Sequence, residues 1–213
     1  MIGLRRFAPA IAALAALVPV SLAFAQGSAG GGGDYAQRFA AECAACHGEA
    51  GKSEIPGTPH LAGQHSYYAV TQLFLFREGR CSNEAMSAVA KTMKDADLRG
   101  FSDFIGTLPP LPAAPPSKPL DAARMTRAEA LADKQKCLFC HGPDLSGGQQ
   151  VPRIAGQREE YLRETLEGYR TGKRVGYTPA MVEPSRTLTS EDVNDLAYFA
   201  AHLPGADTST TGK

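Results

Sequence analysis

The pentapeptide Cys43-Ala-Ala-Cys46-His47 and its second copy, Cys137-Leu-Phe-Cys140-His141, decide how this chain folds. Cys-x-x-Cys-His is the attachment signature of c-type haem. The two thiols of each copy are about one helical turn apart, so both are expected to reach the vinyl groups of a single porphyrin. The histidine that follows is then placed to become an axial ligand of the iron. We therefore predict two covalent haem c groups, attached at Cys43, Cys46, Cys137 and Cys140, with His47 and His141 as axial ligands.

Other uses of paired cysteines explain the sequence less well. Cys-x-x-Cys pairs also bind zinc or act as redox dithiols. A zinc site needs four ligands and gives no reason for a histidine directly after each pair. A thioredoxin-like dithiol needs a strand–helix scaffold, of which the sequence shows no sign. Two complete pentapeptides 94 residues apart favour haem attachment.

The first 25 residues have the pattern of a secretory signal peptide. Arg5 and Arg6 form the charged start, residues 7–22 are an apolar run, and residues 23–25 (Ala-Phe-Ala) match the cleavage pattern. We expect cleavage after Ala25 and export, because c-type haem is attached outside the cytoplasm. A retained membrane anchor is the less favoured alternative, since the apolar run is short for a bilayer span.

The charge of the mature chain is close to neutral. Removing Arg5 and Arg6 from 22 basic residues leaves 20 against 22 acidic residues, a formal charge of −2. Nucleic acid is not an expected partner, because the sequence has no basic stripe of the kind that phosphate binding requires.

Two compositional breaks divide the mature chain. Residues 27–33 are nearly all glycine and serine, which predicts a flexible leader at 26–33, and residues 109–119 are rich in proline, which predicts a semi-rigid spacer. We therefore expect a first domain at 34–108, a linker at 109–119, a second domain at 120–205 and a flexible tail at 206–213.

The two expected domains repeat one another. Three pairs of segments match, namely 59–64 with 152–157, 76–80 with 169–173, and 104–109 with 199–204. Because the matches span nearly all of each half, duplication explains them better than coincidence.

The expected fold class is all-α. In each half one helix opens at a capping box and runs into the haem cysteines, a second has apolar residues at helical spacing, and a third ends before a proline. The six helices are expected from residues 34 and 126 to the cysteines, at 66–78 and 158–171, and from about Asp95 and Ser190 to just before Pro109 and Pro204. Each half is too small to build much core alone, so buried haem is expected to supply apolar surface.

Methionine is the expected second axial ligand, because it partners histidine at most electron-carrying c-type haems. Met181 is the only methionine after the second pentapeptide, whereas Met86 and Met93 follow the first. Aligning the last helices gives an offset of 95 residues, which pairs Met86 with Met181 and Met93 with Leu188. We predict Met86 and Met181 as ligands and Met93 as a core residue. The alternative is that all three only fill gaps in the core.

Further residues are expected to support the haems. Pro59 and Pro152 follow their histidines by 12 and 11 residues, so a carbonyl in each loop is placed to accept the Nδ1–H of the imidazole. Candidate donors to the haem propionates are Gln64, Tyr68, Gln157 and Tyr161, with a shared turn and helix start as the alternative. The residues without a counterpart of the same kind in the other half are Cys81, His60, His65 and His202. Cys81 is expected to be a partly buried bystander, with a reactive thiol or a disulfide-linked dimer as the alternative, and the three histidines are expected at the surface or in loops.

With these features, the chain resembles the diheme cytochrome c4 family. The resemblance is carried by residues 43–48, 61–65 with Tyr68, 80–86, 137–142, 154–157 and 179–181. It implies two tandem class I cytochrome c domains, packed about a pseudo-twofold axis with their haems near one another. Cys81 and the long proline linker depart from the family pattern.

The resemblance also implies a function. It indicates a periplasmic electron carrier, not an enzyme, that moves one electron per haem from a bc1-type complex or a dehydrogenase to a terminal oxidase such as cytochrome c oxidase, or to a reductase. Any association with the membrane is expected to be peripheral and through these partners. The alternative is a cytochrome subunit that stays bound to a periplasmic dehydrogenase. A diheme peroxidase is less favoured, because it needs an open position on one iron and two methionines would close both.

Overall fold

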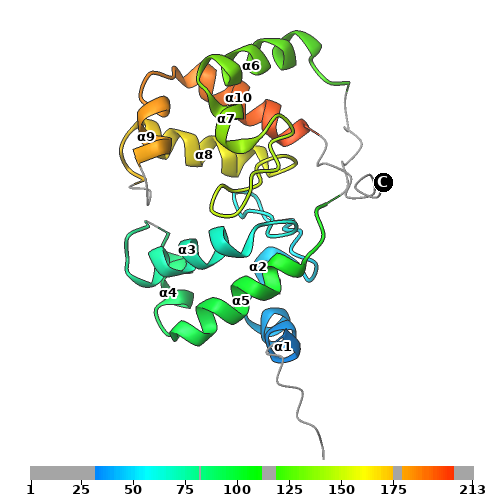
Figure 1. Cartoon of the computed structure of the whole chain (residues 1–213), viewed down its shortest axis with the longest axis vertical. Helices are drawn as coiled ribbons and strands as arrows, with labels where there is room; N and C mark the ends of the chain where they lie inside the picture. The colour runs from blue at the N-terminus through cyan, green and yellow to red at the C-terminus, as the bar shows by residue number, and fades with distance from the viewer. Residues whose placement is uncertain (1–31, 82, 112–118, 175–178, 204–213) are drawn as a thin grey trace, which may run out of the picture. The chain divides into compact units, whose positions relative to one another are not determined.

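The computed structural model describes residues 32–81, 83–111, 119–174 and 179–203, and these ranges are helical apart from their loops (Figure 1). The helices are α1 (Gly32–Glu42), α2 (Ala44–His47), α3 (Ser66–Arg77), α4 (Glu84–Ala90), α5 (Asp95–Thr107), α6 (Ala122–Lys134), α7 (Cys137–His141), α8 (Glu159–Arg170), α9 (Pro179–Ser185) and α10 (Ser190–His202). Within the described ranges, the β-type pairing is limited to an isolated bridge between Gly148 and Val151. The expected signal peptide, most of the leader, most of the linker and the tail lie outside the described residues.

The helices form two equivalent sets, α1–α5 and α6–α10, which confirms the all-α prediction. Each set has a helix before the pentapeptide, a short helix that carries it, and a long final helix. Among the described residues, every pair of helices in contact belongs to one set, as between α3 and α5 or between α8 and α10. The two halves therefore meet through loops and side chains. No described helix is both long and apolar enough to cross a membrane.

The expected start of α6 is wrong. The sequence pattern predicts a capping box at Thr126, but the helix begins at Ala122, because Asp121 Oδ1 accepts the Arg124 N–H at 2.9 Å and caps the helix. The Thr126 hydroxyl instead donates to the Ala122 carbonyl at 3.0 Å from inside the helix. The corresponding side chain in the first half, Asp34, lies outside the described side chains.

Two short helices, α4 and α9, are absent from the sequence-based prediction. Asn83 begins α4, since its Oδ1 accepts the Met86 N–H at 2.9 Å. The described part of α9 begins at Pro179. Seven residues are too few to show a helical period, so the Asn83 cap is the main signal for α4 in the sequence. These helices carry Met86 and Met181.

The core of the first half contains two fully buried aromatic rings. Phe39 and Phe101 are each 1% exposed, and the Tyr35 and Phe101 rings meet edge to face with centroids 5.2 Å apart. Met93 is buried in the same cluster, at 7% exposure, which agrees with its predicted role as a core residue. Aromatic pairs of this geometry stabilise beyond their buried area.

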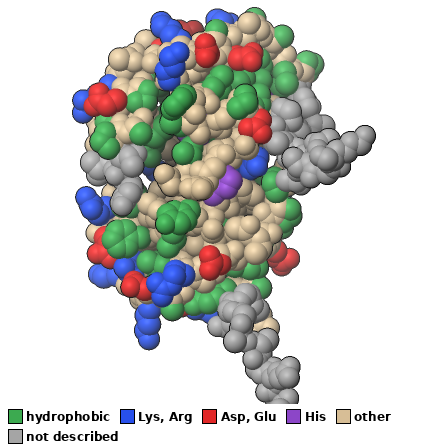
Figure 2. All heavy atoms as spheres, in the orientation of Figure 1, with side chains coloured by type: hydrophobic (Ala, Val, Ile, Leu, Met, Phe, Trp, Pro, Cys, Tyr) green, Lys and Arg blue, Asp and Glu red, His purple; other side chains and the backbone are tan. Residues whose placement is uncertain are grey.

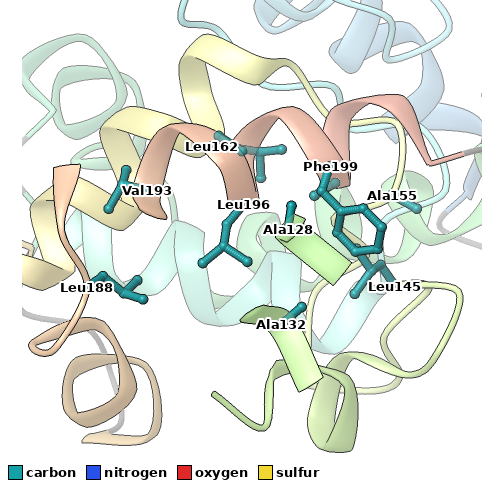
Figure 3. Close-up of a cluster of buried hydrophobic side chains, with 11 residues drawn as sticks. Ala128, Ala132, Leu145, Ala155, Leu162, Leu188, Val193, Leu196 and Phe199 are labelled. Carbon is teal, nitrogen blue, oxygen red and sulfur yellow. The ribbon is translucent and has the colours of Figure 1, made fainter. Parts of the chain in front are cut away.

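The core of the second half is built from smaller residues (Figure 3). Ala128 and Ala132 of α6 face Leu196 and Phe199 of α10, so α6 presents little bulk to its neighbour. Leu145, from the loop after α7, closes this cluster. On the face drawn in Figure 2, acidic and basic side chains are interspersed.

Gly51 and Leu145 occupy the same backbone position in the two halves. The Gly51 carbonyl accepts the N–H groups of residues 61 and 62, at 2.7 and 3.1 Å, and the Leu145 carbonyl accepts those of residues 154 and 155, at 3.0 and 3.2 Å. Both residues have positive φ, 73° and 54°. Leu145 tolerates this conformation because its side chain is buried in the core, at 2% exposure. At position 51 there is no space for a side chain.

Gly51→Ala is expected to lower the free energy of unfolding by about 2–5 kcal/mol, from left-handed strain plus overpacking. The new Cβ would lie 2.7 Å from Ala62 N and 2.9 Å from Leu108 Cδ1. Gly79→Ala is the control, because φ there is 64° but no atom lies within 4 Å, and it should cost only about 1–2 kcal/mol. Guanidinium unfolding of both holo-proteins measures the difference, and equal losses would contradict the steric argument.

Candidate haem sites and the loops between them

The helical turn of each pentapeptide holds the two thiols and the histidine together. The Cys43 carbonyl accepts the His47 N–H at 2.9 Å, so both residues lie on one turn. Cys43 and Cys137 are half-buried against the two cores, whereas Cys46 and Cys140 are exposed. Burial raises the pKa of Cys43 to about 11, and it raises the pKa of Cys137 in the same direction.

The two histidines are held in the same way. His47 is 6% exposed and His141 is 5% exposed, and their Nδ1 atoms each lie 3.0 Å from a carbonyl oxygen, that of Pro59 and that of Pro152. Burial lowers the pKa of both imidazoles, against a smaller opposite effect of the carbonyl. A carbonyl only accepts, so Nδ1 carries the proton of the neutral ring. Nε2 then keeps its lone pair, the form that binds iron.

The loop before each proline is tied back to its pentapeptide. In the first half, the Ser53 hydroxyl donates to the Cys46 carbonyl at 2.7 Å, and the Ser53 N–H donates to His60 Nδ1 at 3.0 Å. In the second half, the His141 carbonyl accepts the Gly147 N–H at 2.8 Å. Gly147 has φ of 69°, and a Cβ there would lie 2.4 Å from the Val151 carbonyl oxygen. These contacts fix the distance between each histidine and its carbonyl.

Met86 and Met181 occupy equivalent short helices. Both side chains are half-buried, and Met86 packs against the core of the first half. Helix α9 is closed by the Ser185 hydroxyl, which donates to the Met181 carbonyl at 2.6 Å. The ligand role of both methionines stays a prediction.

Gln64 and Gln157 join the two halves. The Arg153 N–H donates to Gln64 Oε1 at 3.0 Å, and Gln64 Nε2 donates to the Arg153 carbonyl at 3.1 Å. The His60 N–H donates to Gln157 Oε1 at 2.7 Å, and Gln157 Nε2 donates to the His60 carbonyl at 2.9 Å. Each side-chain amide thus binds both the N–H and the carbonyl of one residue in the other half. The sequence analysis expected both amides near a haem propionate.

A second pair of contacts obeys the same symmetry. His65 Nε2 lies 2.9 Å from the Ser146 carbonyl oxygen, and Arg158 Nη1 donates to the Ser53 carbonyl at 2.8 Å. His65 and Arg158 are 93 residues apart, as are Ser53 and Ser146. The contacts therefore follow the predicted pseudo-twofold relation. His65, expected as a bystander, is a contact residue between the halves, and the sequence signal was its place directly after the repeated glutamine.

Tyr68 and Tyr161 are brought together from α3 and α8. Burial raises the pKa of Tyr68 well above its usual value, and the neighbouring Tyr161 raises it further. Arg174 interacts electrostatically with both tyrosines, lies 5.5 Å from the centroid of the Tyr169 ring, and donates to Gln72 Oε1 at 3.2 Å across the two halves. Arg174 was not singled out in the sequence, because it follows the repeated segment 169–173 and its counterpart in the first half is Cys81, not a basic residue. The propionate role of the tyrosines stays a prediction.

The donor set fits haem. Each half offers two thiols one turn apart and a neutral, oriented imidazole. Two buried guanidinium atoms, Arg153 Nη1 and Arg158 Nε, have no hydrogen-bond partner among the described residues. A carboxylate is the strongest partner for such a group, and haem carries two carboxylates as propionates. A repeated helical fold with two such sites defines a diheme c-type cytochrome.

Comparison with known proteins supports the assignment to the c-type cytochromes. The sequence model of the cytochrome c family matches residues 36–109 and 125–204. Cytochrome c4 of Thiocapsa roseopersicina is 31% identical over 173 residues, covering 76% of this chain and 86% of that protein. The thiosulfate dehydrogenase electron acceptor of Thiomonas intermedia is 31% identical over 179 residues, covering 80% and 82%. The crystal structure of reduced cytochrome c4 from Pseudomonas stutzeri shares the fold, with a TM-score of 0.72 at 24% identity over 81% of this chain and 98% of that one.

The chain therefore belongs to the cytochrome c family and, within it, to the diheme cytochromes c4. It carries two haem c groups, one at each Cys-x-x-Cys-His, and is an electron-transfer protein rather than an enzyme.

Proposed function

We propose that His47 with Met86, and His141 with Met181, hold the two irons of a periplasmic electron carrier, while Cys43, Cys46, Cys137 and Cys140 anchor the porphyrins. The proposal depends above all on the matched pair of 3.0 Å contacts between a histidine Nδ1 and a proline carbonyl. The haem domains are proposed to span 34–108 and 120–205, with residues 109–119 between them. Bound haem supplies one-electron chemistry between ferric and ferrous iron.

The residues of the chain keep the reorganisation that accompanies each electron small. The Pro59 and Pro152 carbonyls fix the tautomer and the plane of the two imidazoles. Met86 and Met181 would each supply a thioether to the iron, so the same residues would serve as ligands in both oxidation states. Cys43 and Cys137, which pack against the two cores, would hold the porphyrins through thioether bonds. Filled positions on both irons argue against a peroxidase.

The location and the partners are part of the proposal. The signal-peptide pattern of residues 1–25, with cleavage after Ala25, supports export to the periplasm. There the carrier would take electrons from a bc1-type complex or a dehydrogenase and deliver them to a terminal oxidase or reductase. A second candidate is the dedicated electron acceptor of one periplasmic dehydrogenase. It is favoured by the relative named as a thiosulfate dehydrogenase electron acceptor, which the chain matches over most of its length.

Electron exchange with cell fractions separates these candidates. The pre-reduced holo-protein is mixed with membranes of its own organism, and the oxidised protein is mixed with periplasmic extract plus thiosulfate. Cyanide-sensitive reoxidation by the membranes supports the oxidase route, whereas reduction that requires thiosulfate supports the second candidate. Rapid consumption of hydrogen peroxide by the purified reduced protein would overturn the carrier proposal in favour of a peroxidase.

A further inference from the structure

One peptide group connects the histidine of the first half to an amide of the second. The carbonyl that faces His47 Nδ1 belongs to Pro59, and the N–H of the same peptide group belongs to His60. That N–H donates to Gln157 Oε1 at 2.7 Å. A continuous chain of hydrogen bonds thus runs from the His47 imidazole through a single peptide group to a side chain of the other half.

An equivalent series of hydrogen bonds runs from the histidine of the second half to a side chain of the first. His141 Nδ1 lies 3.0 Å from the Pro152 carbonyl oxygen, and the N–H of that peptide group, which belongs to Arg153, donates to Gln64 Oε1 at 3.0 Å. The connections are crossed, because each histidine is linked to the glutamine of the opposite half. Each glutamine lies 93 residues from its counterpart, so the crossing follows the symmetry of the repeat.

The orientation of each amide is determined by its contacts. Gln157 Oε1 accepts a second N–H, that of Arg158, at 3.0 Å, while Gln157 Nε2 donates to the His60 carbonyl at 2.9 Å. Gln64 Oε1 likewise accepts the His65 N–H at 3.1 Å. Rotating either amide by half a turn would set its NH₂ group against two N–H donors. Both glutamines are 7% exposed, so water does not compete freely for these bonds.

Hydrogen bonds in such a chain strengthen one another. An acceptor on the N–H of a peptide group makes the carbonyl of that group more negative, and therefore a better acceptor for the imidazole N–H. A stronger bond at Nδ1 raises the basicity of the imidazole as a metal ligand. A more basic ligand favours ferric over ferrous iron, because ferric iron carries the larger charge.

We propose that the two glutamines are positioning residues that tune the haem potentials crosswise, Gln157 for the haem at Cys43 and Cys46, and Gln64 for the haem at Cys137 and Cys140. The proposal rests on the proposed ligation by His47 and His141. Docking of the two halves is then itself a determinant of both potentials. Any partner that loosens the docked halves would raise both.

Leucine substitutions test the crossed assignment. Gln157→Leu should raise the ratio of ferrous to ferric iron about threefold at the first haem, at a fixed ambient potential, and leave the second haem unchanged. This equals a rise of about 28 mV at 59 mV per tenfold change. Gln64→Leu should raise the second haem only, and by less, since its hydrogen bond is 3.0 Å long rather than 2.7 Å. Stepwise reduction followed by haem-methyl NMR resolves the two haems.

The matched control is Gln72→Leu. Gln72 also binds across the halves, through Arg174 at 3.2 Å, but it contacts neither proline peptide, so neither potential should move. An independent readout is the ¹H–¹⁵N shift of the histidine Nδ1–H in the diamagnetic ferrous protein. In Gln157→Leu the His47 signal should move upfield while the His141 signal stays.

Three results would overturn the proposal: no shift in either variant, a shift of the haem in the same half as the substitution, or equal shifts of both haems in both variants. Equal shifts would mean that neither glutamine acts specifically on the haem of the opposite half. Failure of the proposed ligation is seen separately, in the unmodified protein. Its spectra would then lack two low-spin haems with the far-red band of methionine bound to ferric iron.

Discussion

Met181→Ala is expected to lower the reduction potential of the second haem by on the order of 0.1 V or more. A thioether is a soft donor that prefers ferrous iron, so its loss favours the ferric state, with solvent entering the vacated position. The far-red band of methionine bound to ferric iron should fall to half its intensity. Met86→Ala should do the same to the first haem. A spectroscopic redox titration of each variant measures both effects.

Two other methionines serve as controls. Met93 is buried in the core of the first half, at 7% exposure, and Met125 packs against the core of the second. Met93→Leu and Met125→Leu preserve side-chain volume and should cost less than about 1.5 kcal/mol each. Neither should change the far-red band. If Met93→Leu removed half of the band and Met86→Ala did not, the register of the repeat would have assigned the wrong ligand.

The second large effect is expected from Cys137→Ala combined with Cys140→Ala. Haem content should fall from two per exported chain to one, because no thioether then retains the second porphyrin. The second half should also lose cooperative unfolding, since its core of small residues is marginal without the apolar surface of haem. Intact mass counts the porphyrins, and far-UV circular dichroism during thermal unfolding reports the loss of helix.

Cys81→Ala is the control for this pair. Cys81 is 7% exposed, and burial raises the pKa of its thiol, as expected for an inert buried cysteine. Its substitution should leave two haems in place and cost about 1 kcal/mol of stability. A variant with one haem would show that Cys81 takes part in haem attachment. That result would contradict the alignment of the two halves, in which no cysteine corresponds to Cys81.

Much of the fold follows from local patterns. The long helices α3, α5, α8 and α10 end where glycine or proline follows, and their apolar spacing is visible over a dozen residues. The prediction was weaker where the signal is a single cap. Asp121 begins α6 in preference to Thr126, and Asn83 begins α4 without any periodic pattern behind it.

The chemistry of the sites also comes from the sequence, since two thiols and a histidine on one helical turn are local features that need no knowledge of the rest of the chain. The crossed contacts are different. Gln64 and Gln157 were expected beside propionates, but they bind the backbone at Arg153 and His60, in loops roughly 90 residues away. Which partner an amide finds depends on how two folded halves dock, and a hydrogen bond requires that docking to be correct within a few tenths of an ångström. The sequence alone determined what each half can bind, and only the tertiary structure decided that each histidine is linked to the opposite half.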